Sequence, residues 1–104
     1  MSTNNELSHS IKDLEKRFGV MTVGLFIKAF REAEGSSQIE FASKLALSRG
    51  NLCDIEKGRK LISPHRAAQI SKKMGVTPEI LLKLSIQDSL REAKLKYTVE
   101  LTAA

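Results

Sequence analysis

Three polar side chains in the middle of the chain, Arg49, Asn51 and Asp54, have types that can read the edges of DNA bases. An arginine fork can bind guanine O6 and N7 together, which is worth roughly 1–3 kcal/mol of discrimination, and an asparagine amide can pair with adenine. An aspartate can accept a hydrogen bond from cytosine N4. Gly50 has no side chain, so a helix that carries it can approach a base pair closely. These residue types therefore suit base reading in a major groove, provided that one helix presents them together.

Each of these residues also has a second interpretation. Arg49 suits a phosphate contact or a solvated charge. Asn51 suits a phosphate contact or a local hydrogen bond with Ser48 at the start of its helix. Asp54 suits an ion pair that orients Arg49, or repulsion of unsuitable sequences. The residue types alone leave these alternatives open.

The surrounding residues predict a helix-turn-helix over residues 37–58 that would present these side chains. Ser37 and Glu40 form an S-x-x-E capping box, so the first helix is expected to begin at Gln38. Its apolar face has the spacing of a helix and consists of Phe41, Ala42 and Leu45.

The second helix of this motif, over about residues 49–57, is the predicted recognition helix. Ser48 is a good N-cap for it, and Gly58 supplies a left-handed stop. Its buried face is expected to hold Leu52 and Ile55. The polar residues described above would then face outward at its N-terminal end.

Cap and stop signals predict three further helices around the motif, over about residues 22–34, 63–75 and 77–93. Pro64 and Pro78 stand at first helical positions, where a missing N–H is tolerated. The residues expected to face the core are Val23, Phe26, Ile27, Phe30, Ala67, Ile70, Met74, Ile80, Leu81 and Leu84.

Residues 1–21 are expected to form an N-terminal extension with an amphipathic helix that ends at Gly19. Its apolar residues recur at helical spacing and are Leu7, Ile11, Leu14 and Phe18. The last helix carries a second apolar stripe that requires a cover, formed by Leu82, Ile86 and Leu90. Either the N-terminal helix or another chain would provide that cover.

The tail, residues 94–104, alternates apolar and polar residues and predicts a short β-strand. The alternating apolar positions are Leu95, Tyr97, Val99 and Leu101. Because the backbone of a lone strand needs a ladder partner, this strand is expected to pair with its own copy or with another protein.

Composition places limits on the function. The chain has 104 residues, enough for one helix-turn-helix domain (22–93) with its two extensions, and a formal net charge of +5. That charge favours a polyanionic partner, although a solvated basic surface would give the same balance. A single cysteine and a polar N-terminus without an apolar span predict a cytoplasmic protein with no membrane association.

Over roughly residues 23–84, the sequence resembles the Cro/phage-repressor (XRE) type of helix-turn-helix domain. The resemblance rests on an ordered set: Gln38, Phe41-Ala42, Leu45, Ser48, Leu52, Ile55-Glu56-x-Gly58 and Met74-Gly75-Val76-x-Pro78. It implies an all-α, five-helix, lambda-repressor-like DNA-binding domain, to which the N-terminal helix and C-terminal strand are additions. Ala46 departs from the family, which usually has glycine there, and Ser36 stands where a core leucine is common.

The resemblance also implies roles for residues around the recognition helix. Gln38 would contact a phosphate and brace Arg49, unless it only caps its helix. Other phosphate contacts would come from residues at helix starts and in the basic loop after the recognition helix, namely Ser48, Lys57, Arg59, Lys60, His65 and Arg66. A solvated basic loop is the alternative. Arg31 and Glu56 match positions that commonly form a partly buried structural ion pair.

These observations favour a DNA-binding repressor that binds a palindromic operator as a homodimer. The segments NLCDIEKGRK, LxLxxQDxLREA and LKYTVEL further resemble HigA-type antitoxins, which neutralise RelE/ParE-like toxins and repress their own operons. The alternatives are a stand-alone or phage-type repressor without a toxin, and a helix-turn-helix used mainly for protein docking. The sequence has no nucleophile–base pair, no clustered metal ligands and no glycine-rich phosphate loop, so no enzyme activity, metal, cofactor or small-molecule ligand is expected.

Overall fold

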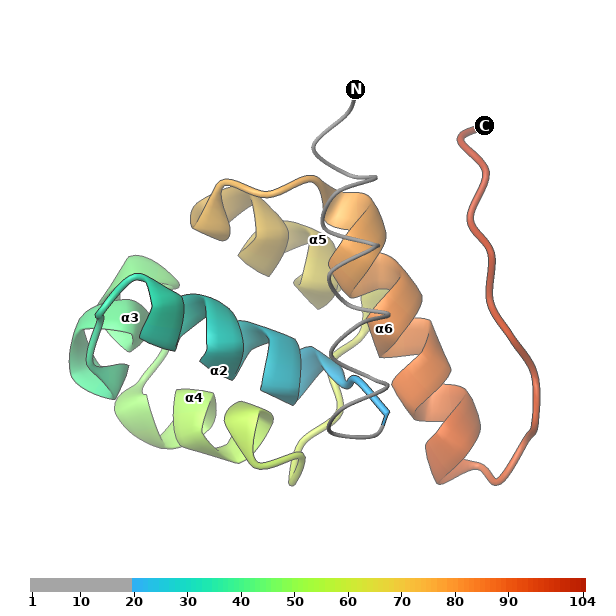
Figure 1. Cartoon of the computed structure of the whole chain (residues 1–104), viewed down its shortest axis with the longest axis horizontal. Helices are drawn as coiled ribbons and strands as arrows, with labels where there is room; N and C mark the ends of the chain where they lie inside the picture. Colours follow the sequence, from blue (N-terminus) through green and yellow to red (C-terminus); the bar gives the residue numbers. More distant parts are fainter. Residues whose placement is uncertain (1–19) are drawn as a thin grey trace.

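The computed structural model describes residues 20–104, and these form five α-helices (Figure 1). The helices are α2 (Val23–Ala33), α3 (Gln38–Lys44), α4 (Arg49–Glu56), α5 (Pro64–Met74) and α6 (Pro78–Glu92). The motif and the three flanking helices therefore have the predicted order. The predicted N-terminal amphipathic helix falls outside the described residues.

All five helices begin where the cap signals of the sequence place them. At four of the caps, Thr22, Ser37, Ser48 and Ser63, the hydroxyl group binds the first turn of the helix. Each hydroxyl accepts a hydrogen bond from the backbone N–H three residues later, at 3.1 Å. The capping box is complete, because the backbone N–H of Ser37 donates to Oε1 of Glu40 at 3.0 Å.

Each of the five helices ends in a Schellman motif, in which two backbone N–H groups return to carbonyls of the last turn. The residue that turns left-handed is a glycine in α2, α4 and α5, where Gly35, Gly58 and Gly75 have φ of 69°, 74° and 78°. In α3 and α6 it is Ala46 (φ 55°) and Lys94 (φ 60°). A side chain at such a φ costs about 1–2 kcal/mol, so two of the five helix ends are strained.

One hydrophobic core joins all five helices. Ile27, Leu52 and Leu81 are fully buried at its centre, and every predicted core residue except Phe30 is buried. Phe30 is half-buried and packs against the core edge, where its ring lies 6.1 Å from that of Phe41. Met21 and Ile62, which were not among the predicted core residues, are also buried.

Helix α2 lies in the middle of the arrangement, with α4 on one side and α6 on the other (Figure 1). α3 packs on α4, and α5 packs on α6. This layout places α4, the predicted recognition helix, at one edge of the described domain, where α2 packs against its inner face. Among residues 20–104, no helix is both long and apolar enough to cross a membrane.

The predicted C-terminal β-strand is wrong. Residues 95–104 contain no strand; after Lys94 the tail turns back and runs alongside α6 (Figure 1). The carboxamide of Gln87 donates to the carbonyl of Tyr97 at 2.7 Å and accepts from the N–H of Val99 at 3.2 Å. A strand needs a continuous ladder of backbone partners, and α6 offers the tail one side-chain amide instead. Leu95, Tyr97, Val99 and Leu101 therefore do not form a pairing strand, despite their alternation.

Candidate nucleic-acid interface

Helix α4 presents polar residues at its N-terminal end because its apolar residues lie on the opposite face. Leu52 and Ile55 are buried against the core, whereas Arg49 and Gly50 are exposed. A Cβ atom built at Gly50 would meet no atom of residues 20–104 within 4 Å. The N-terminal end of α4 is therefore open to a large partner.

Asn51 lies in the first turn of α4, and Asp54 lies in the next turn. They are half-buried and lie three residues apart, so their side chains share one face of the helix. The structure thus places the four predicted base-reading residues on a single helix, two of them exposed in its first turn and two half-buried. The short α3–α4 turn, which contains the left-handed Ala46, sets the angle between the two motif helices.

The basic loop after α4 folds back onto these polar side chains. Nζ of Lys60 donates to Oδ1 of Asn51 at 3.0 Å, and a guanidinium nitrogen of Arg59 lies 3.4 Å from Oδ1 of Asp54. In the described structure Asp54 pairs with Arg59, whereas one of the alternatives left open by the sequence was a pair with Arg49. Lys57, at the C-cap of α4, is exposed.

A hollow of about 430 Å³ lies between α4, this loop and the start of α5. Its apolar lining comes from the core edge, and its polar lining includes Asn51, Lys60, Ser63 and Arg66. Arg66 and the neighbouring His65 are exposed in the first turn of α5. Two cations beside a helix N-terminus give this hollow the electrostatics that favour an anion such as a backbone phosphate.

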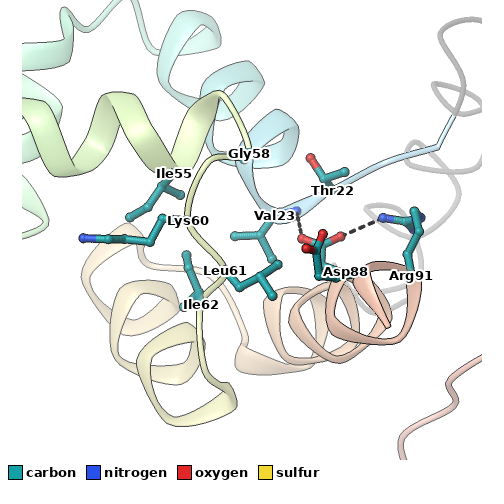
Figure 2. A pocket seen from close by; sticks show the side chains of 11 residues that line it. Thr22, Val23, Ile55, Gly58, Lys60, Leu61, Ile62, Asp88 and Arg91 are labelled. Atoms are coloured by element: carbon teal, nitrogen blue, oxygen red, sulfur yellow. Dashed lines mark hydrogen bonds and ion pairs between the residues drawn. The ribbon is translucent and has the colours of Figure 1, made fainter. Parts of the chain in front are cut away.

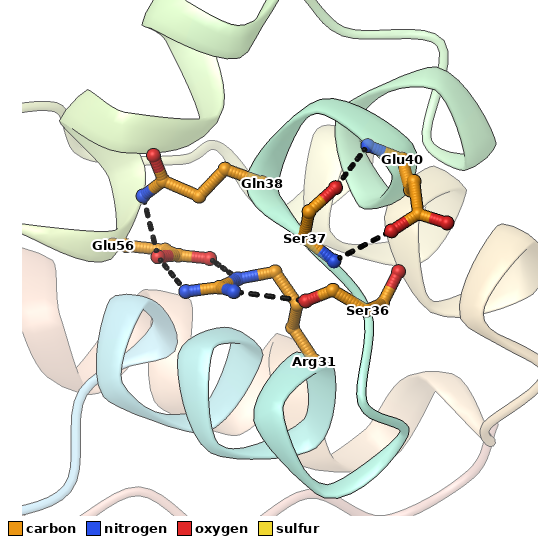
Figure 3. A network of polar contacts seen from close by, with 6 residues as sticks. All are labelled: Arg31, Ser36, Ser37, Gln38, Glu40 and Glu56. Carbon is orange, nitrogen blue, oxygen red and sulfur yellow. Dashed lines mark hydrogen bonds and ion pairs between the residues drawn. The ribbon is translucent and has the colours of Figure 1, made fainter.

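The C-terminal end of α4 is held by a buried polar network (Figure 3). Arg31 of α2 binds Glu56 through two hydrogen bonds, of 2.8 Å from Nε and 3.1 Å from a terminal nitrogen. Its other terminal nitrogen donates to the carbonyl of Ser36 at 3.0 Å. The Glu56 side chain is only 2% exposed. The ion pair that the resemblance implied is thus present, and it links α2 to the end of α4.

Gln38, at the start of α3, belongs to the same network. Its amide nitrogen donates to Oε1 of Glu56 at 3.0 Å, so Glu56 rather than Arg49 is its partner (Figure 3). An amide nitrogen carries two hydrogens, so this bond leaves one for a phosphate. The network therefore fixes the position of a predicted phosphate contact relative to α4.

Charge distribution in this network stabilises both ionised groups. Burial acts to raise the pKa of Glu56, but hydrogen bonds from Arg31 and Gln38 and the nearby positive charge outweigh it, so the pKa lies below its usual value. The hydrogen bond to Glu56 raises the pKa of Arg31. Both residues are therefore charged at neutral pH, and each charge is compensated inside the domain by the opposite charge of the other residue.

Sequence reasoning missed Gly24, which lets α2 touch the end of α4 backbone to backbone. A Cβ atom at this position would overlap the carbonyl oxygen of Ile55 and lie 2.8 Å from that of Glu56. A lone glycine inside an apolar helical run was the available signal, since such a residue often marks a close approach.

Asp88 was missed as well. This residue of α6 accepts the backbone N–H of Val23 at 3.0 Å and an Arg91 guanidinium hydrogen at 3.1 Å, beside a small cavity of about 150 Å³ (Figure 2). It thereby satisfies a free N–H at the start of α2. No local pattern could identify it, because 65 residues separate Asp88 from Val23.

Comparison with known proteins agrees with this geometry. The sequence profile of a family described as helix-turn-helix matches residues 27–81. The crystal structure of the clp gene regulator ClgR from Corynebacterium glutamicum is similar, with a TM-score of 0.51 and 26% sequence identity over 69% of this chain and 78% of that one. No curated protein sequence matches the chain significantly.

Proposed function

Because the chain belongs to the helix-turn-helix family of the Cro/phage-repressor (XRE) type, we propose that it is a sequence-specific repressor that reads DNA with the N-terminal end of α4. Family membership and the similarity to a gene regulator make it a DNA-binding transcription regulator. The finer proposal concerns how it selects its site and what binding achieves.

The observation that carries the proposal is the exposed N-terminal end of α4. Arg49 and Gly50 lie open beside Asn51 and Asp54, on a helix whose other face is buried. We expect Arg49 to read guanine, and Gln38, Ser48, Lys57, Arg59, Lys60, His65 and Arg66 to lie along the phosphates. A net charge of +5 supports this arrangement, because phosphate neutralisation supplies much of the affinity for DNA.

We further propose that two copies act together on an imperfect palindrome. A helix of eight residues reaches only a few base pairs, which is too little for a useful specificity. Two recognition helices in successive major grooves would lie about 34–36 Å apart and double the number of bases read.

The narrowest proposal is that the protein is the antitoxin of a type II toxin–antitoxin operon, which it autoregulates while neutralising a RelE/ParE-like toxin. The resemblance of NLCDIEKGRK, LxLxxQDxLREA and LKYTVEL to such regulators supports it. A short basic reading frame beside the gene is expected. Its absence would favour a stand-alone or phage-type repressor instead.

A fluorescence-anisotropy titration against the DNA immediately upstream of the gene tests the proposal. The duplex and a scrambled version of it are titrated over a series of salt concentrations, with wild type and Arg49→Ala. Lys83→Ala is the matched control, because it removes the same charge from an exposed position on α6, outside the motif. Two protomers per duplex and selectivity for the upstream sequence are expected.

Arg49→Ala is expected to lose about 1–3 kcal/mol of binding to the upstream duplex and much less to the scrambled one. Lys83→Ala should resemble wild type on both. Equal, weak binding of wild type to both duplexes would contradict the operator proposal. Negligible binding at any salt concentration would favour a helix-turn-helix used for protein docking.

A further inference from the structure

We propose that Lys60 positions the Asn51 side chain, so that Asn51 presents hydrogen-bond donors rather than an acceptor to the DNA major groove. This inference rests on the proposed function, since it concerns which base Asn51 selects. It gives Lys60 a role in specificity in addition to any contact with phosphate.

The chemistry of the two groups fixes the direction of the amide. An ammonium has three donors and no acceptor, so it can bind only the oxygen of a carboxamide. Nζ of Lys60 lies 3.0 Å from Oδ1 of Asn51. Rotation of the amide by half a turn would place its NH₂ group against the ammonium, which would bring donor against donor. Asn51 is thereby held with Oδ1 toward the loop and Nδ2 away from it.

Hydrogen bonds and burial hold the backbone at or next to both residues. The N–H of Asn51 donates to Oγ of Ser48 at 3.1 Å, within the cap of α4. Before Lys60, the N–H of Arg59 returns to the carbonyl of Asp54 at 2.9 Å, and after it Ile62 is buried in the core. Lys60 therefore lies on a short segment that is anchored at both ends, close to Asn51.

The remaining hydrogens of Asn51 are available for recognition. Within residues 20–104, no acceptor takes a hydrogen bond from its Nδ2 atom. An NH₂ group directed at the groove matches the acceptors of guanine, at O6 and N7, and O4 of thymine. It opposes the N4 amino group of cytosine, which is itself a donor. We therefore expect Asn51 to favour guanine or thymine over cytosine at the base that it contacts.

The preference of Asn51 for adenine is also expected to change. Bidentate pairing of asparagine with adenine uses the amide oxygen to accept from N6 and the nitrogen to donate to N7. In this protein Oδ1 is already bound by a cation, so the adenine pairing would have to share or displace Lys60. Adenine should therefore be preferred less strongly than a free asparagine would allow.

A phosphate contact and a positioning role predict different results for Lys60. Loss of a phosphate contact weakens binding to all sequences by a similar factor and lowers the salt slope by about 1. Loss of a positioning contact lets the amide of Asn51 rotate, so that it can donate or accept. Loss of the positioning contact therefore changes the base preference at one position of the site and leaves the base preference at the other positions unchanged.

The test uses the full-length protein and a duplex selected by it from a random pool. Dissociation constants are measured for that duplex and for every single base-pair replacement in it. The proteins are wild type and four variants: Asn51→Ala, Lys60→Met, Lys60→Arg and the Asn51→Ala/Lys60→Met double variant. Asn51→Ala identifies the base pair that Asn51 contacts. Lys57→Met is the matched control, because Lys57 carries the same charge but lies at the C-cap of α4.

At that base pair, wild type should prefer the favoured base over cytosine roughly tenfold, and Lys60→Met should reduce this to less than about threefold. Lys60→Arg should retain the preference, because a guanidinium also only donates. Lys60→Met should have no further effect on preference when Asn51 is already alanine. Lys57→Met should weaken binding uniformly.

A uniform loss for Lys60→Met, with the base preferences of wild type, would overturn the inference and leave Lys60 as a phosphate contact. A preference of Asn51 for cytosine would also overturn it. Failure of the proposed function would look different, because wild type would then select no duplex from the pool.

Discussion

The two ends of helix α4 differ in almost every physical respect. At the N-terminal end, Arg49 and Gly50 are exposed, and a Cβ at Gly50 would lie more than 4 Å from every other described part of the chain. At the C-terminal end, Glu56 is buried under Arg31 and Gln38, and the backbone touches Gly24 of α2. The helix has only eight residues, so this change takes place over about two turns.

This difference separates stability from recognition within one short helix. The buried end fixes the angle at which α4 leaves the domain, and the open end can then vary its side chains without disturbing the core. Substitutions at the buried end should therefore change the free energy of unfolding, whereas substitutions at the open end should change DNA affinity.

The largest effect is expected from Glu56→Ala, which leaves the Arg31 guanidinium without its partner. Removing one member of a buried pair costs about 3–5 kcal/mol. Arg31 is 12% exposed and keeps the Ser36 carbonyl, so the lower end of this range is expected. Urea unfolding followed by circular dichroism measures the change. Arg31→Met/Glu56→Met, which removes both charges, should recover part of the loss; an equal or larger loss would contradict the explanation.

The next largest effect is expected from Gly24→Ala. The new methyl group would overlap the Ile55 carbonyl oxygen, which belongs to backbone and cannot rotate away. We expect a loss of about 3 kcal/mol, at the upper end of the usual cost of overpacking. Urea unfolding again measures it.

Gly50→Ala is the matched control, because Gly50 is also the second residue of its helix. With open space around it, alanine should raise stability by up to about 0.5–1 kcal/mol through its better helix propensity. If Gly50 lies close to a base pair, the same variant should bind operator DNA more weakly. Equal destabilisation by both alanines would contradict the proposed difference between the two ends.

Local signals account for most of what the sequence predicted. Thr22, Ser37, Ser48 and Ser63 cap helices through bonds that span three residues, so a short window of sequence contains both partners. The outward position of Arg49 follows from the spacing of the buried residues on the same helix. These features needed no knowledge of the rest of the fold.

What the sequence did not predict depends on distant residues. The alternation of the tail is a local pattern, but a strand forms only with a partner, and Gln87 of α6 supplies a single amide. Gly24 matters because of a carbonyl on another helix, and Asp88 because of an N–H 65 residues away. Similarly, Lys60 was expected at a phosphate or in a solvated loop and not beside Asn51, since the path of the loop that brings it there depends on the burial of Ile62.

Acid should weaken the buried end of α4 by a smaller amount. Because the pKa of Glu56 is lowered in the folded state, folding favours its ionised form, and this contribution is complete above the unfolded pKa of about 4.3. It is lost as the pH falls through the lower folded pKa. We therefore expect the melting temperature of wild type to decrease once the pH is lower than about 4. The melting temperature of Glu56→Gln should decrease less over the same pH range.

Glu40 requires a control in this experiment. The backbone N–H of Ser37 also holds the pKa of Glu40 below its usual value, so protonation of the capping box contributes in the same pH range. Melting curves of Glu40→Gln from pH 3 to pH 7 separate the two groups. If Glu40→Gln removed the acid dependence and Glu56→Gln did not, the network around Glu56 would not be the pH-sensitive element.

The smallest effect is expected from Ala46→Gly, in the turn that leads into the open end of α4. Ala46 has a φ of 55°, which costs an alanine about 1–2 kcal/mol and a glycine almost nothing. Glycine loses more entropy on folding, by about 0.5–1 kcal/mol, so a net gain of up to about 1 kcal/mol is expected. For a domain of this size that corresponds to a rise in melting temperature of several degrees.

Lys94→Gly relieves the same conformation after α6, far from the motif, and should give a similar gain. If Ala46→Gly alone also changed DNA affinity, the turn would set the presentation of Arg49 as well as stability, and the separation between the two ends of α4 would be incomplete.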